Sequence, residues 1–481
     1  MGPKKRAREM QQERAVVLPR RDDGSFDVDE ARRLYDTNGF VALQLLDEPQ
    51  REAGIYELYE RVLMTQPWND PAYTSPRDVA PLVLRDEHGP IRAPAAGAAG
   101  SAALAEHKRR VVRALRSADL DRSVLDDLKE HWPLHVSFGA PCDDAGFHLP
   151  LVWGVRQDPH VYAVVRALSG TDELWVDINR PIMKLPEQGE QEFLHWDLDV
   201  LKKPFVARSP NVQGKVVYTP SRFVAVAQTH TPAFQARFVR DYAKYFPNTT
   251  KPVAKTGLAP EKDPHGYFDQ QREYLLPGGS CIFWNAQLLH GQTKTPRDES
   301  TEFGFYLGFF PAGARPEYAA ALGKLGDESD DDPGGPADEL EDRLRSFNTG
   351  RAPKLWPSFD RIHFYPALWQ CYTGNVTRTI AKLPPGHPSI SSRKSKTKPG
   401  VVYPHLLPWR PPNYDEEYAP PALTLLGRRL LGSAAWPEPG SSATGAGSSA
   451  AGSSALYTPD GAPAGTSRDD AIPCDSDSDC D

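Results

Sequence analysis

The chain has 481 residues, of which 39% are hydrophobic and 25% are charged, and its formal net charge is −8. This composition is ample for a hydrophobic core and excludes a protein that is disordered or fibrous throughout. The sequence holds no apolar run of the roughly 18 residues that a membrane span requires, no secretory signal at its basic start, and no cysteine spacing typical of a disulfide framework or zinc site. We therefore expect an intracellular protein with no membrane partner, cytoplasmic or, if its basic start is a nuclear signal, nuclear.

Most of the negative charge lies near the C-terminus. From Gly432 onward, eight acidic residues accompany a single arginine, so this segment carries −7 and the rest of the chain about −1. Glycine, serine, alanine and proline fill the segment, and residues 432–481 are predicted to be a disordered acidic tail. The near-neutral remainder gives no reason to expect a nucleic-acid partner.

The first predicted elements are a basic arm, a helix and a strand. A run of lysine and arginine near the start predicts a flexible arm over residues 1–25, with the composition of a nuclear-import signal or of an arm that contacts phosphates. Asp27 and Glu30 have the spacing of a capping box, which predicts that a helix begins there, and Gly39 is typical of its end. An opening strand is predicted directly after this glycine.

The middle of the chain alternates short apolar runs with turn signals. Asp158 and Pro159 are typical of a helix N-cap and first turn, and Gly170 is typical of the end of that helix. Runs rich in β-branched and aromatic residues predict strands at residues 174–179, 215–218, 223–227, 280–285 and 301–310. Many short strands of this kind predict a small antiparallel barrel or jelly roll.

Two histidines and an aspartate give the strongest functional signal. His195 and Asp197 alternate along one predicted strand, so their side chains are expected on the same face. His290 follows ninety-five positions later, after a strand that a Pro-Gly-Gly turn introduces. A His-x-Asp pair alone is common by chance, but two histidines and one carboxylate on one side of a metal are diagnostic of Fe(II) oxygenases.

Together these motifs resemble the phytanoyl-CoA dioxygenase family of Fe(II)/2-oxoglutarate oxygenases, over roughly residues 30–312. The matching features are Lys184 followed by a polar turn, the His195-x-Asp197 pair, and the Pro-Gly-Gly strand that leads to His290. The resemblance implies a mainly β protein with flanking helices, built on a double-stranded β-helix of the jelly-roll or cupin type. It also implies Fe(II) held by the three ligands, 2-oxoglutarate as cosubstrate, and hydroxylation with release of succinate and CO2. A carboxylate in the second ligand position favours hydroxylation over halogenation.

The far carboxylate of 2-oxoglutarate is expected to pair with basic residues, because a buried carboxylate needs a charged partner. Lys184 matches the lysine that the family places before the His-x-Asp strand. Family members also carry an arginine shortly after the distal histidine, and here no arginine stands at the expected place. Arg297 comes earlier, in a turn that contains proline, and is either a second cosubstrate-binding residue or a surface charge.

The expected organisation places the oxygenase-like domain at residues 26–312. An acidic Gly/Pro-rich loop follows at 313–343, and an aromatic, proline-rich extension at 344–431 is expected to pack on the core. The expected substrate is a small organic molecule of unidentified kind. Two alternatives stay open: a catalytically degraded barrel that serves as a binding or scaffold protein, and, less favoured, a nucleic-acid-modifying oxygenase.

Overall fold

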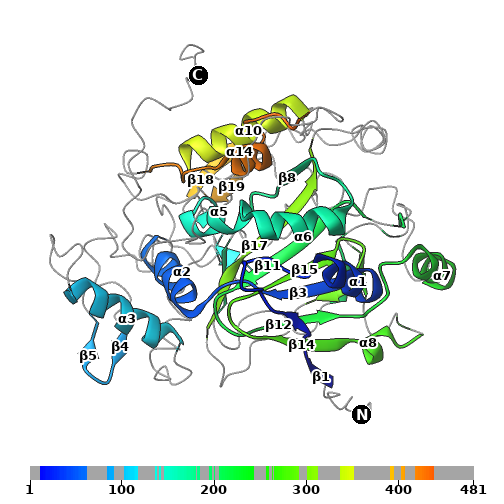
Figure 1. Ribbon diagram of the computed structural model, residues 1–481, viewed down its shortest axis with the longest axis horizontal. Helices are drawn as coiled ribbons and strands as arrows, with labels where there is room; N and C mark the ends of the chain where they lie inside the picture. The colour runs from blue at the N-terminus through cyan, green and yellow to red at the C-terminus, as the bar shows by residue number, and fades with distance from the viewer. Residues whose placement is uncertain are drawn as a thin grey trace.

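Two facing β-sheets form the centre of the molecule, with helices along one side (Figure 1). The computed structural model describes residues 11–61, 84–91, 102–116, 136–137, 140–141, 146–179, 181–184, 194–197, 200, 205–207, 209–242, 256–258, 263, 265–291, 301–312, 336–350, 390–394, 402–406 and 418–437. No helix within these residues is long and apolar enough to cross a membrane.

The first sheet, sheet A, has the strand order β1-β14-β12-β16-β10-β13. Its strands are β1 (Gln11–Arg14), β14 (Arg272–Leu276), β12 (Ser221–Ala225), β16 (His290–Gly291), β10 (Leu194–Trp196) and β13 (Thr256–Leu258). Sheet B has the order β2-β3-β15-β11-β17-β8, and β9 also pairs with β17. Its strands are β2 (Val17–Leu18), β3 (Phe40–Gln44), β15 (Ser280–Asn285), β11 (Val212–Val217), β17 (Glu302–Pro311), β8 (Leu174–Val176) and β9 (Pro181–Lys184).

The helices and three small hairpins complete the described elements. The helices are α1 (Val28–Asn38), α2 (Glu48–Arg61), α3 (Ala102–Arg116), α5 (Pro150–Arg156), α6 (Pro159–Ser169), α7 (Pro232–Tyr242), α8 (Tyr267–Gln270), α10 (Pro336–Thr349) and α14 (Leu425–Leu431). The hairpins pair β4 (Arg85–Asp86) with β5 (Gly89–Pro90), β6 (Val136–Ser137) with β7 (Ala140–Pro141), and β18 (Ile390–Lys394) with β19 (Val402–Leu406).

Alternation along the strands of sheet B separates two hydrophobic cores. On β15, Cys281 and Phe283 belong to the larger core, which sheet B forms with helices such as α5 and α6. Ile282 and Trp284 point the other way, into a core between the sheets that includes Phe223 of β12. The prediction of a mainly β protein with flanking helices and a jelly-roll core is confirmed. Within the described residues the two sheets stay open at their edges and include parallel pairs, so they do not form a closed antiparallel barrel.

The predicted helix ends are confirmed. The Asp27 side chain accepts a hydrogen bond from the Glu30 backbone N–H at 3.0 Å, and Gly39 ends α1 with a φ of 87°. The reciprocal half of the capping box is not formed, because the Glu30 carboxylate pairs with Arg33 instead. Asp158 caps α6, and Gly170 ends it in the left-handed conformation.

Part of the segment expected to be an N-terminal arm belongs to the sheets. Strand β1 already pairs in parallel with β14, and β2 pairs with β3, so the chain belongs to both sheets from Gln11 onward. Arg20 adds an ion pair of 2.8 Å with the buried Asp158. The expectation of a flexible arm over residues 1–25 is therefore wrong for residues 11–18, because backbone pairing with the two sheets fixes them.

The C-terminal boundaries also differ from expectation. Helix α10 begins at Pro336, inside the segment expected to be a loop, and its Arg343 is buried and donates to the backbone oxygens of Leu430 and Leu431. In the same helix Ser346 Oγ lies 2.8 Å from Nε2 of His148, and Trp153 Nε1 donates to Nδ1 of that histidine.

The described chain continues past α14 into the segment expected to be the tail. The ring of Trp436 stacks on Tyr162 of α6, with ring centroids 5.7 Å apart. The predicted boundary of the tail at residue 432 is therefore too early, because a large aromatic side chain beyond it packs on the body of the protein.

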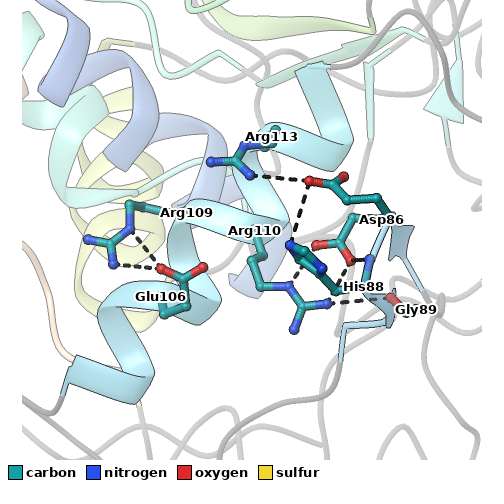
Figure 2. Close-up of polar contacts among 8 residues, drawn as sticks. Asp86, His88, Gly89, Glu106, Arg109, Arg110 and Arg113 are labelled. Atoms are coloured by element: carbon teal, nitrogen blue, oxygen red, sulfur yellow. Dashed lines mark hydrogen bonds and ion pairs between the residues drawn. The ribbon is translucent and has the colours of Figure 1, made fainter.

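Helix α3 carries a cluster of basic residues whose charges are matched locally (Figure 2). Arg110 donates two hydrogen bonds, of 2.6 and 2.7 Å, to the Asp86 carboxylate of the β4–β5 hairpin. These bonds lower the pKa of Asp86 to about 2. Arg109 pairs with Glu106 one turn earlier, and Arg113 lies 3.7 Å from Glu87. The helix therefore holds its hairpin through ion pairs.

Candidate metal centre

The three proposed ligands meet because β10 and β16 are neighbours in sheet A. His195 and His290 are directly paired residues in this antiparallel register. Trp196 points to the opposite face, where its ring lies 4.6 Å from that of Phe238 in α7. Asp197 follows β10 immediately, which places its carboxylate beside both imidazoles.

The donor atoms of the three side chains converge. His195, Asp197 and His290 each offer one ligand atom, and these atoms all lie within 4.8 Å of one another. Nε2 of His195 is 3.1 Å from Oδ1 of Asp197, and Nε2 of His290 is 3.4 Å from Oδ2. All three residues are buried, with exposures of 8%, 4% and 6%. The structure therefore brings together the whole set that the sequence singled out.

Hydrogen bonds to neighbouring groups orient two of these side chains. Nδ1 of His290 lies 2.9 Å from the Leu288 carbonyl oxygen, which can only accept, so Nδ1 donates and Nε2 keeps its lone pair for a metal. Gln213 of β11 donates to Oδ2 of Asp197 at 2.7 Å and accepts from Trp284 Nε1 at 2.7 Å. This chain of contacts fixes the carboxylate before any metal binds.

The electrostatics of the centre suit a cation. Burial would raise the pKa of Asp197, but the imidazoles of His290 and His195 hold it well below its ordinary value. Oδ1 of Asp197 is buried and has no hydrogen-bond donor within the described part of the chain. A buried, ionised carboxylate beside two imidazole nitrogens, with one oxygen unsatisfied, calls for a positive charge. Two nitrogens and one oxygen on one side form a donor set that suits a divalent transition metal.

Aromatic rings surround the distal histidine. Phe223 stacks on the ring of His290 at 6.2 Å between centroids, and Trp284 lies 5.4 Å away. Both aromatic residues belong to the apolar core between the sheets. They exclude water from one side of the centre, which strengthens electrostatic interactions within it.

Of the two basic residues proposed to bind the cosubstrate, Lys184 lies within the described part of the chain and Arg297 does not. Lys184 lies on β9, only 4% exposed, in register with Glu302 of β17. Burial lowers its pKa, Lys215 and Arg222 act in the same direction, and Glu302 opposes them. Arg297 lies outside the residues that the structure describes, so its role stays a prediction.

The structure adds buried polar residues that sequence reasoning missed. Gln213 and Lys215 are alternate residues of β11, and Lys215 lies 3.2 Å from Glu302, eighty-seven positions later in the chain. Glu302 is close to the place where the resemblance led us to expect an arginine. The sequence did contain a signal for Gln213 and Lys215, since both are polar residues at alternate positions of an otherwise apolar strand. Their partners depend on how the strands and the two sheets pack together, which no local pattern specifies.

No family model and no curated protein matches the sequence. Among solved structures, the chain is similar to the epimerase SnoN in complex with Fe3+, alpha-ketoglutarate and nogalamycin RO, at 13% identity and a TM-score of 0.30 over 63% of this chain and 92% of that one. It is similar to EctD from S. alaskensis with bound Fe, at 14% identity and a TM-score of 0.31 over 68% and 94%. It is also similar to GlcNAc Inducible Gene 2 (DUF1479) from Candida albicans, at 11% identity and a TM-score of 0.40 over 78% and 81%. The resemblance to phytanoyl-CoA dioxygenases stays a prediction, and the chemistry of the site rests on its own geometry.

Proposed function

We propose that the protein is a non-haem Fe(II)- and 2-oxoglutarate-dependent dioxygenase that hydroxylates a small organic substrate. The observation that carries the proposal is the buried set of His195, Asp197 and His290, which converges on one point from paired strands. Two histidines and one carboxylate leave the remaining positions around a metal open, as an oxygenase needs for its cosubstrate and for oxygen.

Each part of the site has a distinct task under this proposal. When bound, iron and 2-oxoglutarate would allow dioxygen to act as the oxidant, with one oxygen atom entering the substrate and the other entering succinate as CO2 is released. The two histidines and Asp197 hold the metal, and Gln213 keeps the carboxylate oriented toward it. Phe223 and Trp284 keep water from the distal histidine.

Metal binding is the first test. Anaerobic titration with Fe(II) should show one tight site in the full-length protein and at least about a hundredfold weaker binding in the His195→Ala and Asp197→Ala variants. His88→Ala is the matched control, because His88 lies on the β4–β5 hairpin with its side chain 68% exposed. Equal affinity in all four proteins would contradict the assignment of the metal site.

Succinate release separates an enzyme from a scaffold. The iron-loaded protein should convert 2-oxoglutarate to succinate slowly alone and faster with a true substrate. A protein that binds iron tightly but forms no succinate with any small-molecule library would favour the scaffold alternative.

A further inference from the structure

The backbone that carries Asp197 is held differently from that of the two histidines. In the ladder of sheet A, β10 and β16 pair at His195 and His290, which places these two ligands directly side by side. Asp197 follows the last residue of β10, so this ladder does not extend to it. Gln213 orients the Asp197 side chain, but the orientation of a side chain does not fix the position of its backbone. The placement of the carboxylate therefore depends on contacts of the chain that follows it.

Gln235 of α7 holds two points of that following chain. Its Nε2 donates to the Val200 backbone oxygen at 2.9 Å, and its Oε1 accepts from the Phe205 backbone N–H at 2.6 Å. Val200 and Phe205 are both buried, and they share an apolar core with Trp196, which directly precedes Asp197. One side chain thus joins positions three and eight residues beyond the ligand and anchors them to α7.

Gln287 joins the same chain to the turn that leads to His290. Its Oε1 accepts from the Val206 backbone N–H at 2.9 Å, and its Nε2 donates to the backbone oxygens of Val206 at 3.0 Å and His230 at 3.3 Å. A glutamine amide offers two N–H donors, so these bonds use both. The side chain is buried. Gln287 therefore connects the residue next to Phe205 with a turn that reaches His290 three residues later.

The turn before His290 is held by hydrogen bonds of its own. The Gln287 backbone N–H donates to Oδ1 of Asn285 at 2.9 Å, and the Leu289 backbone N–H donates to Oγ1 of Thr229 at 2.9 Å. Leu289 also lies in the apolar core that contains the chain after the other ligand. Because closely packed and hydrogen-bonded segments transmit strain, a displacement at Gln287 is passed on to His290.

We infer that Gln235 and Gln287 act in series as one link, the glutamine tie, which sets the separation of Asp197 and His290 in the metal site. Oδ2 of Asp197 lies 3.4 Å from Nε2 of His290, and this is the spacing that the tie preserves. Both glutamines are positioning residues, since their amides bind the backbone near the ligands. Links in series fail together, so loss of either glutamine frees the two ligand-bearing segments to shift. This inference rests on the proposed function and adds the residues that set its ligand spacing.

The test titrates the full-length protein anaerobically with Co(II), whose visible absorption bands report the number and geometry of its ligands. Gln235→Met and Gln287→Met should each bind Co(II) at least about tenfold more weakly than wild type and show shifted bands, because supports of metal ligands have effects of about this size. The melting temperature of the metal-free proteins records the structural cost separately. Since either substitution breaks the tie, each variant tests the inference if the other fails to fold.

The double variant distinguishes one tie in series from two independent contacts. Gln235→Met combined with Gln287→Met should bind Co(II) within about threefold of the weaker single variant, because the tie is already broken in each. Two independent contacts would instead multiply their losses, to about a hundredfold or more.

Gln157→Met is the matched control. Gln157 also bridges two segments through its amide: Nε2 donates to the Ala422 backbone oxygen at 3.0 Å, and Oε1 accepts from the Thr424 backbone N–H at 2.8 Å. These bonds join the end of α5 to the start of α14, outside the metal site. The variant should lower the melting temperature of the metal-free protein but leave Co(II) affinity and bands unchanged.

Three results would overturn the inference while leaving the proposed function intact. Wild-type Co(II) affinity and bands in folded Gln287→Met or Gln235→Met would show that the tie does not set the ligand spacing. Multiplied losses in the double variant would show two separate contacts, and equal changes in Gln157→Met would show a general loosening of the fold. Absence of Co(II) binding by wild type, or equal binding by wild type and His195→Ala, contradicts the metal site and with it the proposed function itself.

Discussion

Asp197 shows how one polar contact prepares the metal centre. Its carboxylate is ionised and buried between two imidazoles, and Gln213 fixes one of its oxygens. Gln213 is fixed in turn by Trp284. The orientation of the ligand therefore depends on a residue that would not bind the metal.

We expect Gln213→Leu to weaken Fe(II) binding by about ten- to a hundredfold, because residues that orient metal ligands through hydrogen bonds have effects of this size. Trp284→Phe, which removes only the donor to Gln213, should have a smaller effect in the same direction. Anaerobic titration of both variants measures this. Unchanged affinity in Gln213→Leu would show that Asp197 needs no support.

The sequence predicted the ligands better than the residues that support them. His195 and Asp197 are recognisable because strand alternation is a local rule, and His290 because its preceding turn is distinctive. The contact between Gln213 and Asp197 depends instead on the packing of sheet A against sheet B. No local pattern specifies which strands face each other, so this contact could not be predicted.

Glu57 is a buried carboxyl group whose pKa is raised. It lies in α2, and burial raises its pKa to about 7 from an ordinary value of 4.5. Because the folded state binds this proton more tightly, the stability it contributes is complete below about pH 4.5 and is lost as pH rises through about 7.

We expect Glu57→Gln to increase the free energy of unfolding by about 3 kcal/mol at pH 8 and to change it little at pH 4.5, since one pKa unit corresponds to about 1.4 kcal/mol. Denaturant unfolding at the two pH values measures the difference. Glu60→Gln, an exposed change in the same helix, is the control. A similar gain at both pH values would contradict the assigned cause.

Helix α2 packs closely at Gly54 against Tyr218, which follows β11 of sheet B, and against Leu151 of α5. A Cβ atom added to Gly54 would lie 2.6 Å from Cζ of Tyr218 and 2.7 Å from a methyl group of Leu151. These distances are too short for a carbon contact, so the helix can pack here only because this residue is glycine.

Gly54→Ala sets helix propensity against packing. Alanine favours a helix by up to about 1 kcal/mol, but overpacking costs about 1 to 3 kcal/mol. We expect a net loss of about 1 kcal/mol in the free energy of unfolding, measured in denaturant. Glu60→Ala improves propensity at an exposed position of α2 and should not destabilise. A stabilised Gly54→Ala protein would show that the sheet yields easily.

Element ends were easier to predict than element partners. The caps of α1 and α6 follow from single residues, such as Asp158 and Gly170, whose conformations satisfy the backbone locally. The strands at residues 11–18 were missed because the charged and polar residues of this segment are typical of a flexible arm. Backbone pairing with β14 and β3, however, needs no apolar side chain.

At the scale of the whole molecule, residues 418–437 are part of the folded body. Leu430 and Leu431 of α14 are almost fully buried, and their backbone oxygens accept from Arg343. Trp436 then stacks on Tyr162. These contacts hold α14, which lies in the extension expected to pack on the core, and they also hold Trp436, which lies in the segment expected to be a tail.

Two truncations test this boundary. Removal of residues 438–481 should leave the melting temperature and Fe(II) affinity unchanged, because their composition offers little to bury. Removal of residues 418–481 should lower the melting temperature by more than about 5 °C, since buried leucines are lost. Thermal unfolding followed by circular dichroism measures both. Equal melting temperatures would show that α14 is dispensable.

The contact between His148 and Ser346 has an unusual polarity. Trp153 donates to Nδ1, so this nitrogen must accept, and the ring proton lies on Nε2 and is donated to Ser346. The pair therefore cannot activate the serine as a nucleophile, because the imidazole is the donor. Instead, the neutral His148 ring links α10 to α5 through its hydrogen bonds with Ser346 and Trp153.

This link makes the stability of the folded protein depend on pH in mildly acidic solution. Burial, with nearby arginines, holds the pKa of His148 well below 6.5, so its contribution is present above pH 6.5 and declines as acidity increases. Glu57 acts in the opposite sense over the same range, gaining as pH falls. Two buried groups in different parts of the chain thus have opposite effects on stability as pH falls, and these effects partly cancel.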